Sequence, residues 1–124
     1  MRYLIDTNSC IYLFANGYEP LKQRIATTPR HDIGLSAVVV AELALGVQLG
    51  RPPTRAALER LVQEMPILPF DEGAARAYST LPFRRGRIDR LLAAHALSLD
   101  MTVITDNERD FADVPGLRIE NWTL

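Results

Sequence analysis

The spacing of apolar and polar residues along the chain predicts short strands that alternate with longer helices. Short β-prone runs mark strand candidates at Tyr3–Ile5, Ile33–Leu35, Ile67–Leu68, Met101–Thr105 and Leu117–Glu120. Between them, apolar periodicity or strongly helical composition predicts helices that end at 17 and that span 20–25, 37–49, 54–65, 71–81 and 88–99. Residues suited to cap these helices are Thr7 or Asn8, Ser36, Thr54 and Asp71.

This alternation favours an α/β fold: a short central parallel sheet flanked by helices in a three-layer α/β/α arrangement. The length of 124 residues is that of one domain, so residues 1–124 are expected to form a single unit. In parallel sheets the ligand site lies beyond the carboxyl ends of the strands. Polar residues that follow strands are therefore the first candidates for chemistry.

Composition narrows the setting in which the protein works. The formal net charge is −1, so a nucleic-acid partner requires basic groups gathered on one face. One such group along the chain consists of Arg84, Arg85, Arg87 and Arg90. The lone cysteine, Cys10, precludes a disulfide within the chain, and the N-terminal apolar run is too short for a signal peptide. We therefore expect a cytoplasmic protein without a membrane span.

Acidic side chains occur where predicted strands end or where an apolar helix is interrupted. Asp6 ends the first strand, and Asp106 follows the strand that ends at 105. Glu42 lies within the most apolar helix, and Asp89 opens the helix at 88–99. Each position alone is explained by a turn, a helix cap or a solvent-facing site. If the sheet is parallel, however, most of these side chains converge at one edge.

Clustered carboxylates indicate a bound cation, because like charges buried together repel one another unless a positive ion neutralises them. Mg²⁺ prefers oxygen ligands and keeps several waters. A metal held by carboxylates supplies what phosphodiester hydrolysis needs, namely an activated water and stabilisation of charge on the phosphate. The sequence contains no His/Cys set with zinc spacing and no phosphate-binding glycine loop. His95, in an apolar helix, is expected to be a packed or hydrogen-bonded histidine.

Several segments together form a pattern that is specific as a set. They are Asp6-Thr7-Asn8 after the first strand, the serine–glutamate helix at Ser36–Leu43, the helix start Asp89–Ala96, the run from Thr102 through Asn107 to Phe111, and the ending Val114–Trp122. These segments, in this order and over nearly the whole chain, resemble PIN-domain ribonucleases of the VapC toxin type. Asp-Thr-Asn alone would be a weak signal.

The resemblance implies a PIN-like fold and an endoribonuclease that depends on Mg²⁺, with Mn²⁺ as a substitute. It also implies the role of toxin in a type II toxin–antitoxin (VapBC) module, a homodimer, and a VapB-like antitoxin as partner. By position, Asp6, Glu42 and Asp89 correspond to the catalytic, metal-binding acids of the family. Attack by water on the phosphorus would leave a 5′-phosphate and a 3′-hydroxyl.

The resemblance is less direct at the family's fourth acidic position, which falls on Asn107. Asp106 beside it, or Asp110 before Phe111, is a candidate substitute. Residues expected to hydrogen-bond the carboxylates are Thr7, Asn8 and Ser36. The candidate contacts to RNA phosphates are Arg84, Arg85, Arg87 and Arg90.

Apolar residues on two helices support the expected assembly. Leu45 and Leu49 lie on one helix, and Leu58, Leu61 and Val62 lie on another. Together they exceed what a core this small is expected to hide. A homodimer, with a groove for an amphipathic antitoxin segment, would cover such a surface.

Other functions remain open at the level of sequence. A metal-dependent DNase or flap nuclease would use the same acids. A non-catalytic PIN-like module that binds a protein would have no need of mutually repelling carboxylates. A phosphatase or a receiver-like acidic pocket would require a basic group beside the acids, such as a lysine after a strand, and the sequence shows none.

Overall fold

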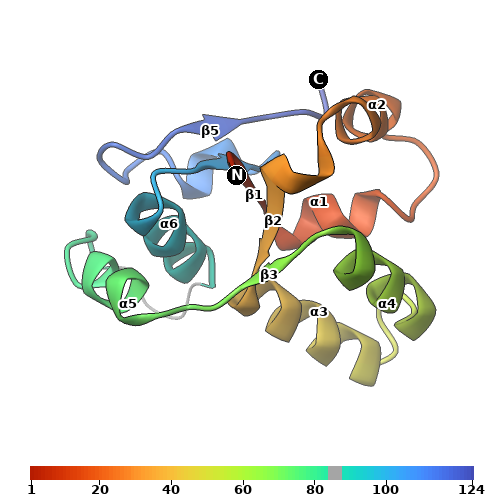
Figure 1. Ribbon diagram of the computed structural model, residues 1–124, viewed down its shortest axis with the longest axis horizontal. Coiled ribbons are helices and arrows are strands. Elements are labelled where there is room, and N and C mark those ends of the chain that lie inside the picture. The colour runs from red at the N-terminus through yellow and green to blue at the C-terminus, as the bar shows by residue number, and fades with distance from the viewer. Residues whose placement is uncertain (84–87) are drawn as a thin grey trace.

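The computed structural model describes residues 1–83 and 88–124, and within these ranges the chain forms a five-stranded parallel sheet flanked by helices (Figure 1). The strands are β1 (Tyr3–Ile5), β2 (Ile33–Ser36), β3 (Ile67–Leu68), β4 (Thr102–Ile104) and β5 (Ile119–Glu120). The α-helices are α1 (Thr7–Tyr12), α2 (Glu19–Thr27), α3 (Ala37–Gln48), α4 (Arg55–Glu64), α5 (Glu72–Tyr78) and α6 (Ile88–Ser98). Short 3-10 helices occupy Arg30–Asp32 and Glu108–Asp110.

β1 lies at the centre of the sheet, whose strand order is β3-β2-β1-β4-β5. Tyr3 pairs in register with Ile33 of β2 on one side and with Thr102 of β4 on the other. Leu4 and Ile5 are fully buried. Burial of consecutive residues is typical of a parallel strand that is covered on both faces, so the apolar run at the start of the chain forms the middle of the core.

The path of the chain reverses at β1. It runs from β1 outward to β2 and β3, and then crosses back to β4 on the other side of β1. Crossovers between parallel strands are right-handed. Helices that connect strands in one direction along the sheet therefore cover one face, and helices that connect strands in the opposite direction cover the other face. In Figure 1, α3 and α4 lie to one side of the sheet, and α5 and α6 pack together on the other side. The carboxyl ends of β1 and β4 meet where the two groups of helices separate, which is the usual ligand site of such sheets.

The predicted α/β/α arrangement is confirmed, and three of the four predicted helix caps are present. The caps that were expected and are present are Ser36 on α3, Thr54 on α4 and Asp71 on α5. The prediction that Thr7 or Asn8 caps α1 was wrong. Asp6 Oδ1 accepts the backbone N–H of Ser9, so Asp6 itself is the cap, and the helix begins directly after β1.

The apolar face of α4 belongs to the core of this chain. Leu61 is buried, and Leu58 and Val62 pack partly against the same core. Leu45 on α3 and Leu49, its C-cap residue, are by contrast 58% and 55% exposed. The apolar surplus expected from the sequence is therefore carried by α3 and not by α4. In the described part of the chain, no helix has the length and apolar character needed to cross a bilayer.

Candidate active site at the carboxyl edge of the sheet

Asp6 follows β1 directly and is only 4% exposed. Its Oδ1 accepts a hydrogen bond from the backbone N–H of Ser9 at 2.8 Å, so the first turn of α1 orients the carboxyl group. Burial raises the pKa of Asp6, hydrogen bonds from Thr105 and Ser9 lower this pKa in part, and the charge of Asp106 raises it further. The carboxylate is thus a desolvated charge that a nearby cation would stabilise.

Three residues were candidates for the fourth acidic position, and the structure separates them. Asp106 acts electrostatically on Asp6 and accepts a hydrogen bond from the hydroxyl of Tyr12 at 2.9 Å. The side-chain amide of Asn107 donates to Asp110 Oδ2 at 2.5 Å, so these two residues bind each other. Among the three, Asp106 is the carboxylate whose charge raises the pKa of Asp6.

Tyr12 is a residue that the sequence pattern did not single out. It lies in α1, its hydroxyl bonds to Asp106, and its ring stacks on Tyr18 with centroids 4.0 Å apart. Burial, the hydrogen bond to Asp106 and nearby negative charges raise the pKa of Tyr12 to about 12, so the hydroxyl stays protonated and can donate. The only signal in the sequence was the hydroxyl itself, which usually finds a partner when a tyrosine is half-buried.

Glu42 reaches the same edge from α3. The hydroxyl of Thr7, the residue after Asp6, donates a hydrogen bond to Glu42 Oε1. Thr7, Asn8 and Glu42 also line one cavity of about 390 Å³. The first motif and the glutamate helix therefore meet through a direct side-chain contact, as expected for Thr7. Asn8 is an exposed residue of the cavity wall, and among residues 1–83 and 88–124 its side chain forms no hydrogen bond to a carboxylate.

Asp89 is the second residue of α6 and is half-buried. The next residue, Arg90, was expected to contact RNA phosphate, but the structure gives it a different role. Its side chain is 1% exposed and forms an ion pair with Asp113, so the guanidinium is held inside the protein. The other members of the expected basic group, Arg84, Arg85 and Arg87, lie outside the described residues.

Ser36 and His95 form a buried pair between β2 and α6. Ser36 Oγ accepts the backbone N–H of Val38 and lies 2.8 Å from His95 Nδ1. Its partners are therefore not the carboxylates that the sequence predicted. The His95 ring packs edge-on against Phe70 with centroids 5.5 Å apart. Burial lowers the pKa of His95, which favours the neutral ring. The expectation of a packed, hydrogen-bonded histidine is confirmed.

The donor set at this edge suits a hard divalent cation. Carboxylates of Asp6, Asp106 and Glu42 are accompanied by hydroxyls, and such oxygen donors match Mg²⁺ or Mn²⁺ rather than a thiolate-preferring metal. The one thiol, Cys10, is buried, and this burial raises its pKa, so it is a poor ligand and nucleophile. Within residues 1–83 and 88–124, no three His, Cys, Asp or Glu side chains are close enough to ligate one ion directly. A bound ion therefore needs water molecules to complete its shell, as Mg²⁺ commonly does.

Comparison with known proteins agrees with this geometry. Residues 3–117 match the family model described as PIN domain. The chain is 30% identical to the "tRNA(fMet)-specific endonuclease VapC" of Salmonella typhimurium, over 98% of each chain, and 31% identical to "Ribonuclease VapC1" of Haemophilus influenzae, over 99% of each. Among solved structures, DNA-bound VapBC from Salmonella typhimurium superposes with a TM-score of 0.87 at 28% identity, over 98% of each chain.

Proposed function

Because the chain belongs to the PIN-domain family and resembles its VapC ribonucleases over nearly its full length, we propose that Asp6, Glu42 and Asp89 are the catalytic acids of an endoribonuclease. The observation that carries this assignment is the environment of Asp6. Its carboxylate is buried near Asp106, at the end of the strand on either side of which the chain adds its later strands. A charge in this position is costly unless it serves to hold a cation. RNA is the substrate, and the protein is the toxin of a toxin–antitoxin pair.

The roles of the acids follow from their positions. Asp6 and Asp89 would hold a divalent metal ion directly or through water, Glu42 could assist them, and Asp106 is the candidate for the fourth acidic position. A bound ion supplies a lowered pKa for water and neutralises charge on the phosphate. Glu42 orients the attacking water and accepts its proton, and the hydrogen bond from Thr7 fixes the direction of the Glu42 carboxylate.

The bond changes balance without a further reactant. The water oxygen forms a bond to phosphorus, and the bond from phosphorus to the 3′ oxygen of the preceding nucleotide breaks. Glu42 takes one proton from the water, and the leaving oxygen receives a proton from solvent. The products are a 5′-phosphate and a 3′-hydroxyl, the outcome that distinguishes attack by water from attack by the ribose 2′-hydroxyl.

Mg²⁺ is the proposed physiological ion, with Mn²⁺ able to replace it. Support comes from the oxygen-only donor set, which matches the ligand preference of these ions. We also place the protein in the cytoplasm, where its single thiol, Cys10, stays reduced.

The proposed assembly is a homodimer that binds a VapB-like antitoxin. Several structural relatives were solved as VapBC pairs, among them VapBC2 from Rickettsia felis bound to a promoter DNA fragment. On the present chain, the exposed Leu45 of α3 and Leu49 directly after it supply apolar surface that a second copy or the antitoxin can cover.

A cleavage assay with purified protein tests the proposed function against its nearest rival. Total RNA and single-stranded and flap DNA are incubated with the protein in EDTA, in Mg²⁺ and in Mn²⁺. RNA alone should be cut, only with a divalent ion, and Asp6→Asn should remove the activity. Cutting of DNA at a similar rate would favour the metal-dependent DNase or flap nuclease. No cutting of either polymer would favour a non-catalytic binding module.

A further inference from the structure

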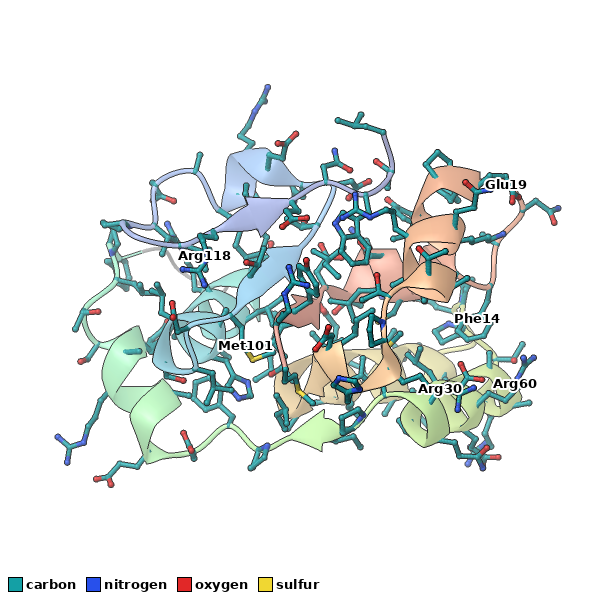
Figure 2. The ribbon with its side chains drawn as sticks, turned by 45° about the horizontal axis from the view of Figure 1, so that its top comes forward. Phe14, Glu19, Arg30, Arg60, Met101 and Arg118 are labelled. Carbon is teal, nitrogen blue, oxygen red and sulfur yellow. The ribbon has the colours of Figure 1, made fainter. Side chains whose placement is uncertain are left out.

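A groove of about 740 Å³ lies between α1, α3 and the first half of α4. Its walls include Phe14, which follows α1, and Arg51, Arg55 and Arg60. Figure 2 shows Phe14 and Arg60 on the same side of the molecule. Phe14 is 40% exposed, and the three arginines are exposed as well. The groove therefore combines an aromatic ring with three guanidinium groups at the surface.

This groove adjoins the candidate active site. The cavity that contains Thr7, Asn8 and Glu42 is also lined by Arg51, so one arginine borders both spaces. Ile11 and Pro52 likewise border both. The two cavities are therefore adjacent, and a chain molecule that lies in the groove is next to the cavity of the glutamate.

In the part of the chain that the structure describes, these three arginines form no ion pair with an acid. Within the described residues, none of them lies within 4.0 Å of a carboxylate oxygen, whereas Arg76 and Arg118 on other parts of the surface are each paired with an acid. Glu59 is a neighbour of Arg60 on α4, but it lines neither cavity. The groove is therefore a local basic surface on a chain whose net charge is −1.

A polyanion that approaches the acids meets negative charge, so its binding requires cations close by. Grooves that hold single-stranded nucleic acid combine backbone-tracking positive charge with aromatic rings on which bases stack. We propose that this groove binds the RNA substrate next to the scissile bond, with Arg51, Arg55 and Arg60 contacting phosphates and Phe14 stacking on a base. The inference rests on the proposed ribonuclease function and adds the path of its substrate.

The arginines should differ in effect according to their distance from the acids. Arg51 borders the cavity of Glu42, so its loss should lower kcat as well as affinity. Arg55 and Arg60 line the groove but not the cavity of Glu42, so their loss should weaken RNA binding and raise KM with little change in kcat. If the arginines had only a structural role, the three variants would not separate into one that lowers kcat and two that raise KM.

Binding is measured on the cleavage-deficient Asp6→Asn protein by fluorescence anisotropy, with a labelled single-stranded RNA of about 20 nucleotides and with tRNA, at several salt concentrations. Arg51→Gln, Arg55→Gln and Arg60→Gln should each weaken binding about three- to tenfold and reduce the salt slope by about 0.7 to 0.9. Phe14→Leu should weaken binding about fivefold or more with an unchanged slope. The matched control is Arg76→Gln on α5, at the far end of the molecule from α4, and it should behave like the parent (Figure 1).

Two results would overturn the proposal. The arginine variants would bind RNA with the affinity and salt slope of Arg76→Gln, or they would lose binding of the cognate antitoxin while RNA binding stays intact. In either case the parent protein still cleaves RNA, so the proposed function stands and only the substrate path is wrong. A parent protein that neither cleaves nor binds RNA would overturn both.

Discussion

The hydroxyl of Tyr12 donates a hydrogen bond to Asp106 Oδ2 at 2.9 Å and so joins α1 to the end of β4. The two residues are far apart in sequence, and the contact links the segments that follow the paired strands β1 and β4. Because the charge of Asp106 contributes to the raised pKa of Asp6, the position of Asp106 affects the ionisation of Asp6. Tyr12 is thus a positioning residue for a carboxylate of the site.

Tyr12→Phe should impair metal binding more than folding. The change removes the hydroxyl but keeps the ring that stacks on Tyr18. Loss of a group that orients a metal-site carboxylate typically costs about tenfold or more in metal affinity or activity. We expect the Mg²⁺ concentration for half-maximal cleavage to rise about tenfold, and the calorimetric Kd for Mn²⁺ to rise in parallel. Tyr18→Phe is the control, and an unchanged Mn²⁺ Kd in Tyr12→Phe would count against this role.

Thr7→Val should lower kcat by about tenfold with little change in KM. The substitution keeps the shape of the side chain but removes the hydroxyl that holds Glu42 Oε1, so the carboxylate loses its fixed direction. Thr7→Ser restores the hydroxyl and should recover most of the rate. Steady-state cleavage of one RNA substrate measures both constants. Equal rates for the valine and serine variants would show that the hydrogen bond has no part in catalysis.

Asp6→Asn should stabilise the metal-free protein by roughly 0.5–2 kcal/mol, as relief of a functional site typically does. Burial raises the pKa of Asp6, so its ionised form is destabilising at neutral pH, and asparagine removes the charge while still capping α1. Mg²⁺ should reduce or reverse this difference in stability between the variant and the parent, because the ion stabilises only the protein that binds it.

Thermal melts of the parent and of Asp6→Asn, in EDTA and in Mg²⁺, measure this difference in stability. The control is Asp71→Asn, which makes the same exchange at the exposed cap of α5 and should be nearly neutral in both buffers. If the parent shows no Mg²⁺-dependent shift and Asp6→Asn gains nothing in EDTA, the acids do not form a metal site.

Acid should destabilise the protein partly through His95. Its pKa in the folded state is lowered from 6.5, mainly by burial, with Asp71 opposing the shift. Above pH 6.5 the ring is neutral in both states and contributes nothing. Below 6.5 the unfolded ring takes up a proton that the folded ring does not, so the free energy of unfolding falls as the pH drops toward the lowered pKa.

His95→Gln isolates this contribution, because the amide can still bond to Ser36 but does not titrate. Urea unfolding at about pH 7.5 and pH 5.5 should show a smaller loss of stability in the variant than in the parent. The same loss in both proteins would mean that other groups account for the acid sensitivity.

Local pattern was sufficient for much of the fold. Strand runs such as Tyr3–Ile5 and caps such as Ser36 depend on neighbouring residues, which the sequence displays directly. The resemblance singled out Asp6 and Glu42 as candidates because their motifs are short and ordered along the chain. Contacts between distant segments were less accessible: the bond of Tyr12 to Asp106 depends on β1 lying beside β4, which periodicity does not reveal.

Charge was the feature that local pattern predicted least well. Arg90 follows a run of basic residues and was expected at the surface, but the fold buries it against Asp113. Arg51, Arg55 and Arg60 are close in sequence, but that they line one groove with Phe14 of a distant segment depends on the packing of α1 against α3 and α4. Whether a charged side chain is free or paired is decided by tertiary contacts.

Sequencing of RNA fragment ends after brief expression tests the central claim most directly. The parent chain should create new 5′-phosphate ends at defined positions. Asp6→Asn, Glu42→Gln and Asp89→Asn should each nearly abolish them, and double variants should lose little more than single ones, because the acids act as a unit. Asp71→Asn should produce the ends of the parent. The same new ends at undiminished frequency from the Asp6→Asn protein would contradict the claim that this carboxylate edge cleaves RNA.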